Sequence, residues 1–383
     1  MSKIIIAGGG FAGVWAALAA AATRHRSQAD DIDITLMSKD ADLCIRPRLY
    51  EGARADMLVP LKPLCDAVGV TFAQHEVSGV TAEQVKTRDG QSLSHDRLVL
   101  ATGSHLALPP VAGAKSHGFA VDDYVSTAQL DAHLQGLDLS DKRAATLVVV
   151  GASFSGLEIA TSLRDRLGAA ARILLIDQAE VAGQSLGASL TDEIAAALAR
   201  AEVTFVGGET VAEVDGARVT LGSGTVIEAA TCIFATGLRP SPLVQGLGAQ
   251  AADGRLQVDA TLRLPSQPTI LAAGDVAQGQ ADPDHTTLMS CQHAMPMGLV
   301  AGQNAVLDLL GQDLIRYAQP DYATCLSLGK SDAIFTQGWD RTIMLQGTEG
   351  AGMKSQINET WIYPPSPALG RDAIFEAVLP TSG

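Results

Sequence analysis

The sequence predicts an α/β fold built from two doubly wound, Rossmann-like domains. Short apolar runs, suited to buried parallel strands, alternate with longer helical patterns along most of the 383 residues. Two of these runs each lead into a glycine-rich turn and then an Ala/Leu-rich helix, and the turns start at Gly8 and Gly151. We therefore expect two repeats of one architecture in a single chain.

The strands are expected where short apolar runs precede glycine turns or follow helical stretches. They are Lys3–Ala7, Ile32–Met37, Arg97–Ala101, Thr146–Val150, Arg172–Ile176, Cys232–Ala235, Thr269–Ala272 and Thr342–Leu345. The segments Asp89-Gly90 and Gly222-Ser-Gly224 are typical of hairpin turns, so smaller antiparallel insertions are expected as well.

The order of these patterns predicts that the second domain is inserted into the first. Pro109-Pro110 closes the first unit, and the second unit ends near Pro240–Pro242. A strand-plus-glycine pattern then resumes around Gly274 without a complete unit of its own. We expect one domain from residues 1–112 and 255–312, a second from 113–254, and a small C-terminal α+β cap over 313–383.

Each glycine-rich turn has the spacing of a dinucleotide-binding loop. The first glycine allows a tight turn, the middle small residue lets the backbone approach a pyrophosphate, and the last lets helix pack on strand. Free N–H groups at the helix start then favour the anion. The expected contacts are Gly8, Gly10, Phe11, Ala12 and Gly13 in the first loop, and Gly151, Ser153, Phe154, Ser155 and Gly156 in the second. Two such loops imply two nucleotides, typically a flavin and a nicotinamide.

Composition and charge limit the partners. The chain is 47% apolar and 18% charged, with 27 basic and 42 acidic residues and a net charge of −15, which argues against nucleic acid or an anionic membrane as a partner. No apolar run is long enough to span a bilayer, so membrane association would be peripheral at most. The first strand begins at once, which leaves no room for a signal peptide.

The cysteines indicate neither a metal site nor a disulfide framework, because they are scattered without a C-x-x-C pair. They are Cys44, Cys65, Cys232, Cys291 and Cys325. This pattern fits a reducing compartment, and we expect a cytoplasmic protein with no bound metal. The oligomeric state stays open, a homodimer included.

The residue that follows the second strand of each unit bears on nucleotide choice, because an acid there commonly holds the ribose hydroxyls. In the second unit this residue is Asp177, followed by Gln178 rather than a basic residue. A 2′-phosphate would therefore meet a carboxylate without a counter-charge, which favours NADH over NADPH. The first unit has Ser38 in this position, followed by Lys39 and Asp40, so a hydroxyl that can still hydrogen-bond a ribose replaces the usual carboxylate. Ser38 and Lys39 are therefore the candidate nucleotide contacts at this position.

Three further glycine turns follow strands in a characteristic order. Ala101-Thr102-Gly103 and Ala235-Thr236-Gly237 are near-copies, and Ala273-Gly274-Asp275 comes later. Gly274 would permit close backbone approach, while Asp275 can accept hydrogen bonds from the polyol chain of a flavin. Each turn is a weak signal alone, but their order relative to the two loops is specific.

With these motifs, residues Lys3 to about Leu345 resemble the pyridine nucleotide–disulfide oxidoreductase superfamily. Within it the chain is most similar to type II NADH dehydrogenases and to the apoptosis-inducing-factor-like ferroptosis suppressor proteins. The resemblance implies FAD on the first loop, with Asp275 on its ribityl chain, and NADH on the second loop with Asp177. Glu158 would lie near the nicotinamide and flavin, and its simpler alternative is a first-turn acid favoured by the helix dipole.

The resemblance also assigns the segment Ser290–Gly298 to a helix start beside the flavin pyrimidine ring, where a helix N-terminus stabilises negative charge. Type II dehydrogenases have two glutamines in this helix that line a quinone pocket. Gln292 matches the first, whereas Pro296 replaces the second. His293 is a candidate proton donor or, equally, a packed core residue.

The segment Asp42–Glu51 lies where relatives place residues along the flavin. Arg46 and Arg48 are candidate contacts for flavin or substrate. Cys44 suggests an alternative, because single-cysteine relatives, the NADH peroxidases and coenzyme A-disulfide reductases, have a redox cysteine in this region. Against this, Cys44 follows its strand more closely than theirs, and a reactive thiol needs a lowered pKa.

We therefore expect an FAD-dependent NADH oxidoreductase that passes hydride from NADH to flavin N5 and then electrons to a small-molecule acceptor such as a quinone. One alternative is a peroxide, persulfide or disulfide reductase that uses Cys44. Another is a flavin redox sensor or a reductase subunit that serves a partner protein.

Overall fold

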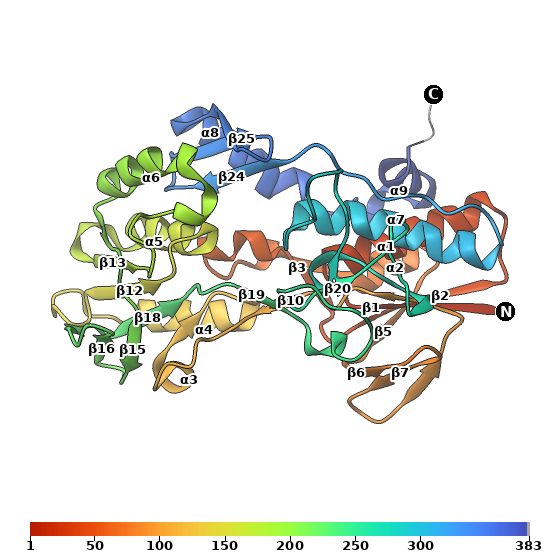
Figure 1. The fold of residues 1–383 in the computed structure, drawn as a ribbon, viewed down its shortest axis with the longest axis horizontal. Helices are drawn as coiled ribbons and strands as arrows, with labels where there is room; N and C mark the ends of the chain where they lie inside the picture. Colours follow the sequence, from red (N-terminus) through yellow and green to blue (C-terminus); the bar gives the residue numbers. More distant parts are fainter. Residues whose placement is uncertain (381–383) are drawn as a thin grey trace.

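The computed structural model describes residues 1–380 and contains two α/β lobes, each built on its own parallel sheet (Figure 1). The first sheet has the order β21-β22-β9-β1-β2-β5, parallel except where β21 pairs with β22. Its strands are β1 (Ser2–Ala7), β2 (Ile32–Ser38), β5 (Thr71–Gln74), β9 (Arg97–Leu100), β21 (Arg263–Leu264) and β22 (Gln267–Ala272). Fully apolar strands such as β1 are buried because helices cover the sheet.

The second sheet has the order β11-β18-β12-β13-β14 and is parallel throughout. Its strands are β11 (Phe119–Ala120), β12 (Thr146–Val150), β13 (Arg172–Ile176), β14 (Val203–Val206) and β18 (Thr231–Phe234). The helices of the two lobes are α1 (Phe11–Arg26), α2 (Leu61–Val68), α3 (Ala114–His117), α4 (Tyr124–Gln135), α5 (Phe154–Leu167), α6 (Ala188–Arg200) and α7 (Cys291–Leu309). The expected strands are confirmed, with ends that differ by at most two residues.

The chain enters and leaves the second lobe through a pair of short strands. β10 (Ser104–Leu106) follows the first Ala-Thr-Gly turn, β19 (Leu238–Pro240) follows the second, and the two pair antiparallel between the lobes (Figure 1). After β19 the chain returns to the first sheet, where β22 lies parallel to β9. The insertion of one doubly wound unit into the other is thus confirmed, and the domain boundaries given above stay a prediction.

Small antiparallel sheets extend both lobes. Their strands are β3 (Asp42–Cys44) with β4 (Leu58–Pro60), β6 (Val77–Val80) with β7 (Gln84–Thr87) and β8 (Ser92–Ser94), and β15 (Val211–Val214) with β16 (Arg218–Leu221) and β17 (Val226–Glu228). A further small sheet is the parallel pair β20 (Leu256–Gln257) and β23 (Ala277–Gln278). Both expected hairpin turns are confirmed, Asp89-Gly90 between β7 and β8 and Gly222-Ser-Gly224 between β16 and β17.

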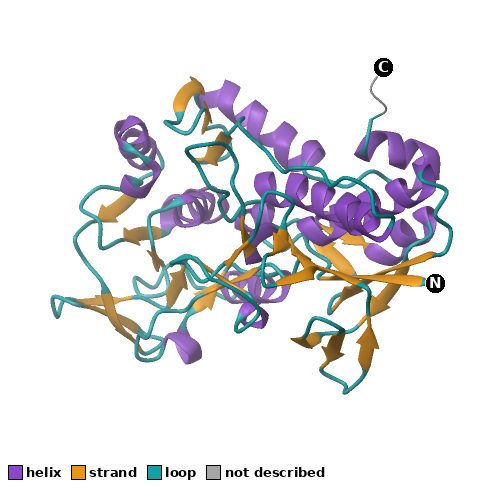
Figure 2. Cartoon of the chain, turned by 45° about the vertical axis from the view of Figure 1, so that its right-hand side comes forward, coloured by secondary structure: helices purple, strands orange, loops and turns teal. Residues whose placement is uncertain are grey.

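The C-terminal part of the chain contacts both lobes. A three-stranded sheet, β24 (Ala323–Ser327), β25 (Ala333–Gln337) and β26 (Thr342–Leu345), and helix α8 (Gly347–Gln356) lie over the second lobe (Figures 1 and 2). The chain then crosses back, and α9 (Arg371–Val378) packs on α1, with the rings of His25 and Phe375 5.5 Å apart. The C-terminal part therefore ties the two lobes together.

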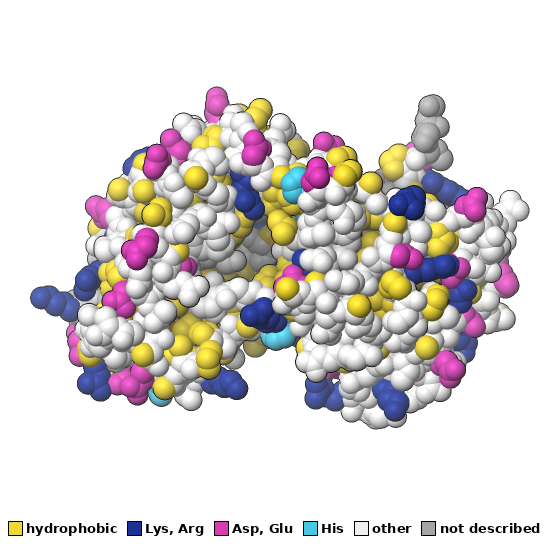
Figure 3. All heavy atoms as spheres, in the orientation of Figure 1, with side chains coloured by type: hydrophobic (Ala, Val, Ile, Leu, Met, Phe, Trp, Pro, Cys, Tyr) yellow, Lys and Arg dark blue, Asp and Glu magenta, His cyan; other side chains and the backbone are white. Residues whose placement is uncertain are grey.

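The molecule is hollowed between its lobes (Figure 3). Each lobe has its own hydrophobic core, the first extending from β1 and α1 to α7 and α9, and the second around β12, β13 and α5. Within residues 1–380, no helix combines the length and the apolar character needed to cross a bilayer.

Candidate functional site

The two glycine-rich loops adopt nearly the same geometry. Gly8 and Gly151 have φ angles of +121° and +105°, and a Cβ on either would lie 2.1 Å and 2.4 Å from the carbonyl oxygens of Ala101 and Ala235. A Cβ on Gly13 or Gly156 would lie 1.7 Å from the carbonyl oxygen of the first glycine of its own loop. Helix and loop are therefore packed so closely that only glycine fits.

The start of each helix after these loops has free N–H groups. Gly10 caps α1 and Ser153 caps α5, in both cases without a side-chain hydrogen bond and without an acid in the first turn. Nothing lies within 4 Å of the position that a Cβ on Gly10 would take, and Ser153 and Ser155 are exposed. Each helix start is thus open toward a bound anion, as a dinucleotide pyrophosphate requires.

The two residues at the ends of the second strands lie beside their loops, as expected. Asp177 follows β13, and its Oδ2 accepts from Ala152 N (2.6 Å) while its Oδ1 accepts from Ala179 N (2.8 Å). Ser38, at the end of β2, is buried, accepts from Asp40 N (3.2 Å), and lies against Gly9. The carboxylate is therefore held in place by backbone donors at the edge of the second loop.

Lys39, by contrast, is exposed. Its ammonium forms one ion pair, with the neighbouring Asp40, at a distance of 3.7 Å between Nζ and Oδ2. Such a surface pair contributes little to stability. Nothing in this geometry directs Lys39 toward a particular ligand group.

The Ala-Thr-Gly turns support both loops from the neighbouring strand. Ala101 N donates to Ala7 O (2.8 Å) and Ala235 N donates to Val150 O (2.8 Å). Thr236 Oγ1 donates to Ala107 O (3.0 Å), whereas the buried Oγ1 of Thr102 has no partner. An unpaired buried hydroxyl in the first lobe leaves a polar group available to a ligand.

A polar chain links the first Ala-Thr-Gly turn to the Gly274-Asp275 turn. Ser104 Oγ donates to Asp275 Oδ2 (2.6 Å), and Arg46 Nη1 donates to both Ser104 Oγ (3.0 Å) and Ser104 O (3.2 Å). Arg46 also pairs with Asp122. Burial raises the pKa of Asp275, although Ser104, Arg46 and Arg255 oppose this shift. Two residues predicted separately, Arg46 and Asp275, are thus brought together.

Glu158 is buried and joined to a lysine from the C-terminal part of the chain. Lys354 Nζ, from α8, lies 2.8 Å from Glu158 Oε1, and these side chains are only 13% and 10% exposed. Glu158 Oε1 also accepts from Ser327 N (3.1 Å), and Lys354 Nζ donates to Cys325 O (2.9 Å). Glu158 lies beyond the first turn of α5, so its simpler interpretation as a first-turn acid is wrong.

Charge and burial oppose each other in this pair. Burial disfavours the ammonium of Lys354, but Glu158 and Tyr50 raise its pKa overall. Burial also raises the pKa of Tyr50 to about 12, and Lys354 Nζ lies 5.4 Å from the centre of the Tyr50 ring. Asn358 Nδ2 donates to Tyr50 Oη (3.1 Å). A charged, nearly dry cluster therefore lies between the lobes, next to α5.

Arg48, the second arginine of the segment before α2, has a structural environment. It is 2% exposed and binds Glu51 through two nitrogens, at 3.1 and 2.8 Å. Its Nη1 also donates to Tyr363 Oη (2.7 Å). Arg48 is therefore paired within the protein and ties the first lobe to the C-terminal part.

The start of α7 is closely packed against the segment that enters β24. With the Gln292 amide oriented so that both of its polar atoms have partners, its nitrogen donates to Ala323 O (2.6 Å) and its oxygen accepts from Ala323 N (3.0 Å). His293 is fully buried, its Nδ1 lies 3.1 Å from Gln319 Oε1, and burial lowers its pKa. The Nε2 of His293 has no partner. Pro296 lies inside the helix.

The cysteines have the environment of unreactive thiols. Burial raises the pKa of Cys44 to about 11, with a further contribution from Asp123 that Arg46 opposes. Burial likewise raises the pKa of Cys291 and of Cys325 to about 11. A nucleophilic cysteine requires the opposite shift.

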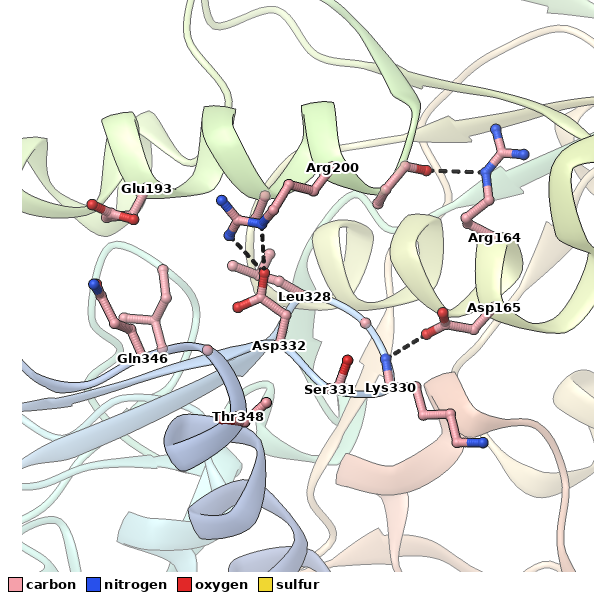
Figure 4. Close-up of a pocket in the computed structure, with 15 residues that line it drawn as sticks. Arg164, Asp165, Glu193, Arg200, Leu328, Lys330, Ser331, Asp332, Gln346 and Thr348 are labelled. Carbon is pink, nitrogen blue, oxygen red and sulfur yellow. Dashed lines mark hydrogen bonds and ion pairs between the residues drawn. The ribbon is translucent and has the colours of Figure 1, made fainter.

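A separate cavity of about 560 Å³ lies on the outer side of the second lobe, between α5, α6 and the C-terminal sheet (Figure 4). Two contacts cross it: Arg200 Nη2 lies 2.6 Å from Asp332 Oδ2, and the backbone N–H of Lys330 donates to Asp165 Oδ2 (2.5 Å). It contains no residue predicted to bind a cofactor. The cavity lies at the interface between the second lobe and the C-terminal part.

Sequence reasoning missed Lys354, the partner of Glu158. The residue lies in a helix of low amphipathic character, 196 positions away from the glutamate, and has no motif around it. The only signal that could have indicated Lys354 is the burial of Glu158, because a buried carboxylate needs a cationic partner.

Comparison with known proteins agrees with this geometry. A family model described as pyridine nucleotide-disulphide oxidoreductase matches residues 2–298. An NADH dehydrogenase-like protein of Mycobacterium tuberculosis is 40% identical over 380 residues, covering 95% of each chain. Demethylphylloquinone reductase NdbB of Synechocystis is 27% identical over 350 residues, covering 87% of this chain and 86% of its own. In fold, NDH2 from Plasmodium falciparum in complex with NADH gives a TM-score of 0.79 at 14% identity, covering 98% of this chain and 97% of that one.

Proposed function

Because the chain belongs to the pyridine nucleotide-disulphide oxidoreductase family, we propose that it is an FAD-dependent NADH oxidoreductase that reduces a quinone-like small molecule. The observation that carries this proposal is the pair of glycine loops with matching geometry, one in each lobe and both closed by an Ala-Thr-Gly turn. Two such loops in one molecule fit two dinucleotides that exchange electrons.

The first lobe has the groups that FAD needs. The start of α1 offers free N–H groups for the pyrophosphate, and no side chain fills the space at Gly10. Thr102 Oγ1 is an unpaired buried hydroxyl, and Asp275 is an acceptor for the ribityl hydroxyls. Bound there, FAD would supply the two-electron chemistry, taking hydride from NADH and giving electrons to the acceptor. The protein's part is to position both partners and exclude water.

The second lobe fits NADH in preference to NADPH. Asp177 is held at the edge of the loop by two backbone donors, at the end of the second strand, where an acid commonly binds the adenosine ribose. Gln178 adds no positive charge beside it. A 2′-phosphate would be repelled here, whereas two ribose hydroxyls could donate to the carboxylate.

The Glu158–Lys354 pair contributes charge at the junction. Lys354 stays protonated because Glu158 is 2.8 Å away, and the two side chains are nearly dry. A fixed cation in a low-dielectric site stabilises negative charge that develops nearby during electron transfer. The pair also holds α8 against α5.

Thiol chemistry at Cys44 is disfavoured by its environment, because a thiol with a pKa of about 11 is protonated at neutral pH. The sensor or reductase-subunit alternative shares the same cofactors and differs only in acceptor. Rapid reduction of soluble quinones by the isolated chain would exclude it.

The proposal is tested by flavin release and rapid mixing. The purified protein should be yellow, and denaturation should release FAD. NADH should bleach the flavin under anaerobic conditions faster than NADPH does, and a soluble quinone should restore the colour. A colourless protein that cannot be loaded with FAD would overturn the proposal, as would a flavin that NADPH reduces at least as fast.

A further inference from the structure

Arg341, in the β25–β26 hairpin turn, lies in a layered stack that spans all three parts of the chain. Its guanidinium carbon is 5.9 Å from the centre of the Phe154 ring and 5.7 Å from the centre of the Tyr322 ring. Beyond Tyr322, the rings of Trp339 and His285 continue the stack at centroid distances of 4.3 Å each. The order His285, Trp339, Tyr322, Arg341, Phe154 leads from the loop before α7 to the first residue of α5.

The Arg341 cation lacks a counter-charge. Its Nη1 donates to Leu186 O (2.8 Å), and its Nη2 reaches Tyr322 Oη at 3.4 Å, a long and weak contact. Its Nε is buried with no partner. Within the described residues no carboxylate oxygen lies within 4.0 Å of the guanidinium. A half-buried cation with an unpaired N–H donor lacks both a counter-charge and a hydrogen-bond acceptor, and an anion would supply both.

The backbone of this turn is constrained in a way that keeps the side chain there. Arg341 has a φ of +53°, which costs a non-glycine residue free energy unless its surroundings impose it. The carbonyls of Asp340 and Arg341 both lie within reach of Ser189 Oγ, at 3.3 and 3.4 Å. The turn is therefore anchored on the second lobe, and the stacked rings brace it from the other side.

The neighbouring groups indicate which anion fits. Phe154 is the residue at which α5 begins, and the N–H groups of that start have no side-chain cap. The guanidinium carbon of Arg341 lies 5.9 Å from the centre of the ring of this first residue. The cation therefore lies beside the helix on whose start the proposed function places a pyrophosphate.

We infer that Arg341 is a binding residue for the pyrophosphate of NADH, contributed by the C-terminal part to the second lobe. The inference rests on the proposed function for the donor and adds a residue that no dinucleotide-loop motif contains. Arginine suits this role because its planar donors match phosphate oxygens. The hairpin turn would then close one side of the NADH site.

The test uses ligands that differ in the pyrophosphate. In the FAD-loaded protein, Arg341→Gln should raise the Kd of ADP-ribose, measured by calorimetry, about tenfold or more, as expected for one lost charge-assisted hydrogen bond. Arg341→Lys should lie between wild type and Arg341→Gln. The KM for NADH should rise in parallel, while the limiting rate of flavin reduction at saturating NADH should stay unchanged. Reduction by 1-benzyl-1,4-dihydronicotinamide, which has no phosphate, should not change.

Arg200→Gln is the matched control, because Arg200 also joins the second lobe to the C-terminal part but at the outer cavity. It should leave the Kd of ADP-ribose at the wild-type value. The inference is overturned if Arg341→Gln binds ADP-ribose like wild type, or if Arg200→Gln weakens binding equally. A wild-type protein that neither binds ADP-ribose nor is reduced by NADH would instead overturn the proposed function.

Discussion

The two glycine loops share the same close backbone approaches, yet the helices that follow them have different surroundings. Twelve of the sixteen residues of α1 are buried, against seven of the fourteen in α5. Helix α1 is enclosed by α7 and α9, and Cβ atoms on Gly298 and Gly302 would lie 2.3 and 2.1 Å from its carbonyl oxygens. Helix α5 keeps Ser153 and Ser155 exposed at its start.

The residue two places after the last glycine of each loop shows the same contrast. In the first lobe it is Trp15, buried in the core, and in the second it is Glu158, paired with Lys354. An enclosed loop suits a cofactor that stays bound, and an open loop with polar groups suits a substrate that must leave after each turnover. The local sequence thus produces the same loop geometry twice, and the packing around each loop differs, one loop being enclosed and the other open.

The largest expected effect on cofactor use, the complete loss of FAD or of reduction by NADH, comes from adding one methyl group to either loop. Gly13→Ala and Gly156→Ala place a Cβ 1.7 Å from a carbonyl oxygen, and such overpacking costs about 1–3 kcal/mol. Gly13→Ala should yield protein without FAD, measured by the absorbance of released flavin. Gly156→Ala should keep its FAD but lose reduction by NADH. The reverse assignment of the two losses would show that the lobes have been interpreted the wrong way round.

The second effect concerns Glu158 and Lys354, a pair with no counterpart in the first lobe. Glu158→Gln or Lys354→Met leaves one buried charge unpaired, which should lower the free energy of unfolding by about 3–5 kcal/mol. The double variant should recover most of this stability in thermal unfolding but not the rate of flavin reduction by NADH. If its rate recovered as well, the pair would be structural only.

A smaller effect separates the residues at the ends of the second strands. Asp177→Ala should raise the KM for NADH roughly tenfold, because two ribose hydroxyls lose a charged acceptor. Ser38→Ala should leave the FAD content of the purified protein nearly unchanged, since that hydroxyl is buried against Gly9. Steady-state rates with NADH and NADPH check the first variant, and equal losses with both donors would speak against ribose recognition.

The smallest effect is expected at the cysteines. Because the pKa of Cys44 is raised to about 11, its thiol is protonated below that pH, and Cys44→Ser should leave turnover unchanged. Alkylation by iodoacetamide, followed by mass spectrometry, should accelerate with pH up to about 11. Cys232, more deeply buried in the second lobe and with a pKa raised to about 12, should react more slowly still. A Cys44 that reacts fully at pH 7 would revive the thiol-reductase alternative.

Much of the fold and of the geometry of the glycine-rich loops was predictable because the signals are local. The strand that ends at Ala7, the glycines that follow it and the helix after them lie within the 25 residues Ser2–Arg26, and the corresponding elements around Gly151 lie within the 22 residues Thr146–Leu167. Ser38 and Asp177 were expected at the ends of the second strands for the same reason, and β2 ends at Ser38 while Asp177 follows β13; that they bind a nucleotide stays a prediction. The tight turn at each loop needs glycine whatever surrounds it, so its spacing could be recognised without the structure.

The sequence by itself therefore determined the two glycine-rich loops, their order and the insertion of one lobe into the other. The tertiary structure decided which side chains contact the helix that follows the second loop. Lys354 pairs with Glu158, and Arg341 packs on the ring of Phe154. Both partners come from the C-terminal part, which no glycine motif marks and which reaches the second lobe only when the chain folds back. Short-range patterns encode backbone shape, whereas the pairing of distant charges depends on packing that only the folded chain brings about.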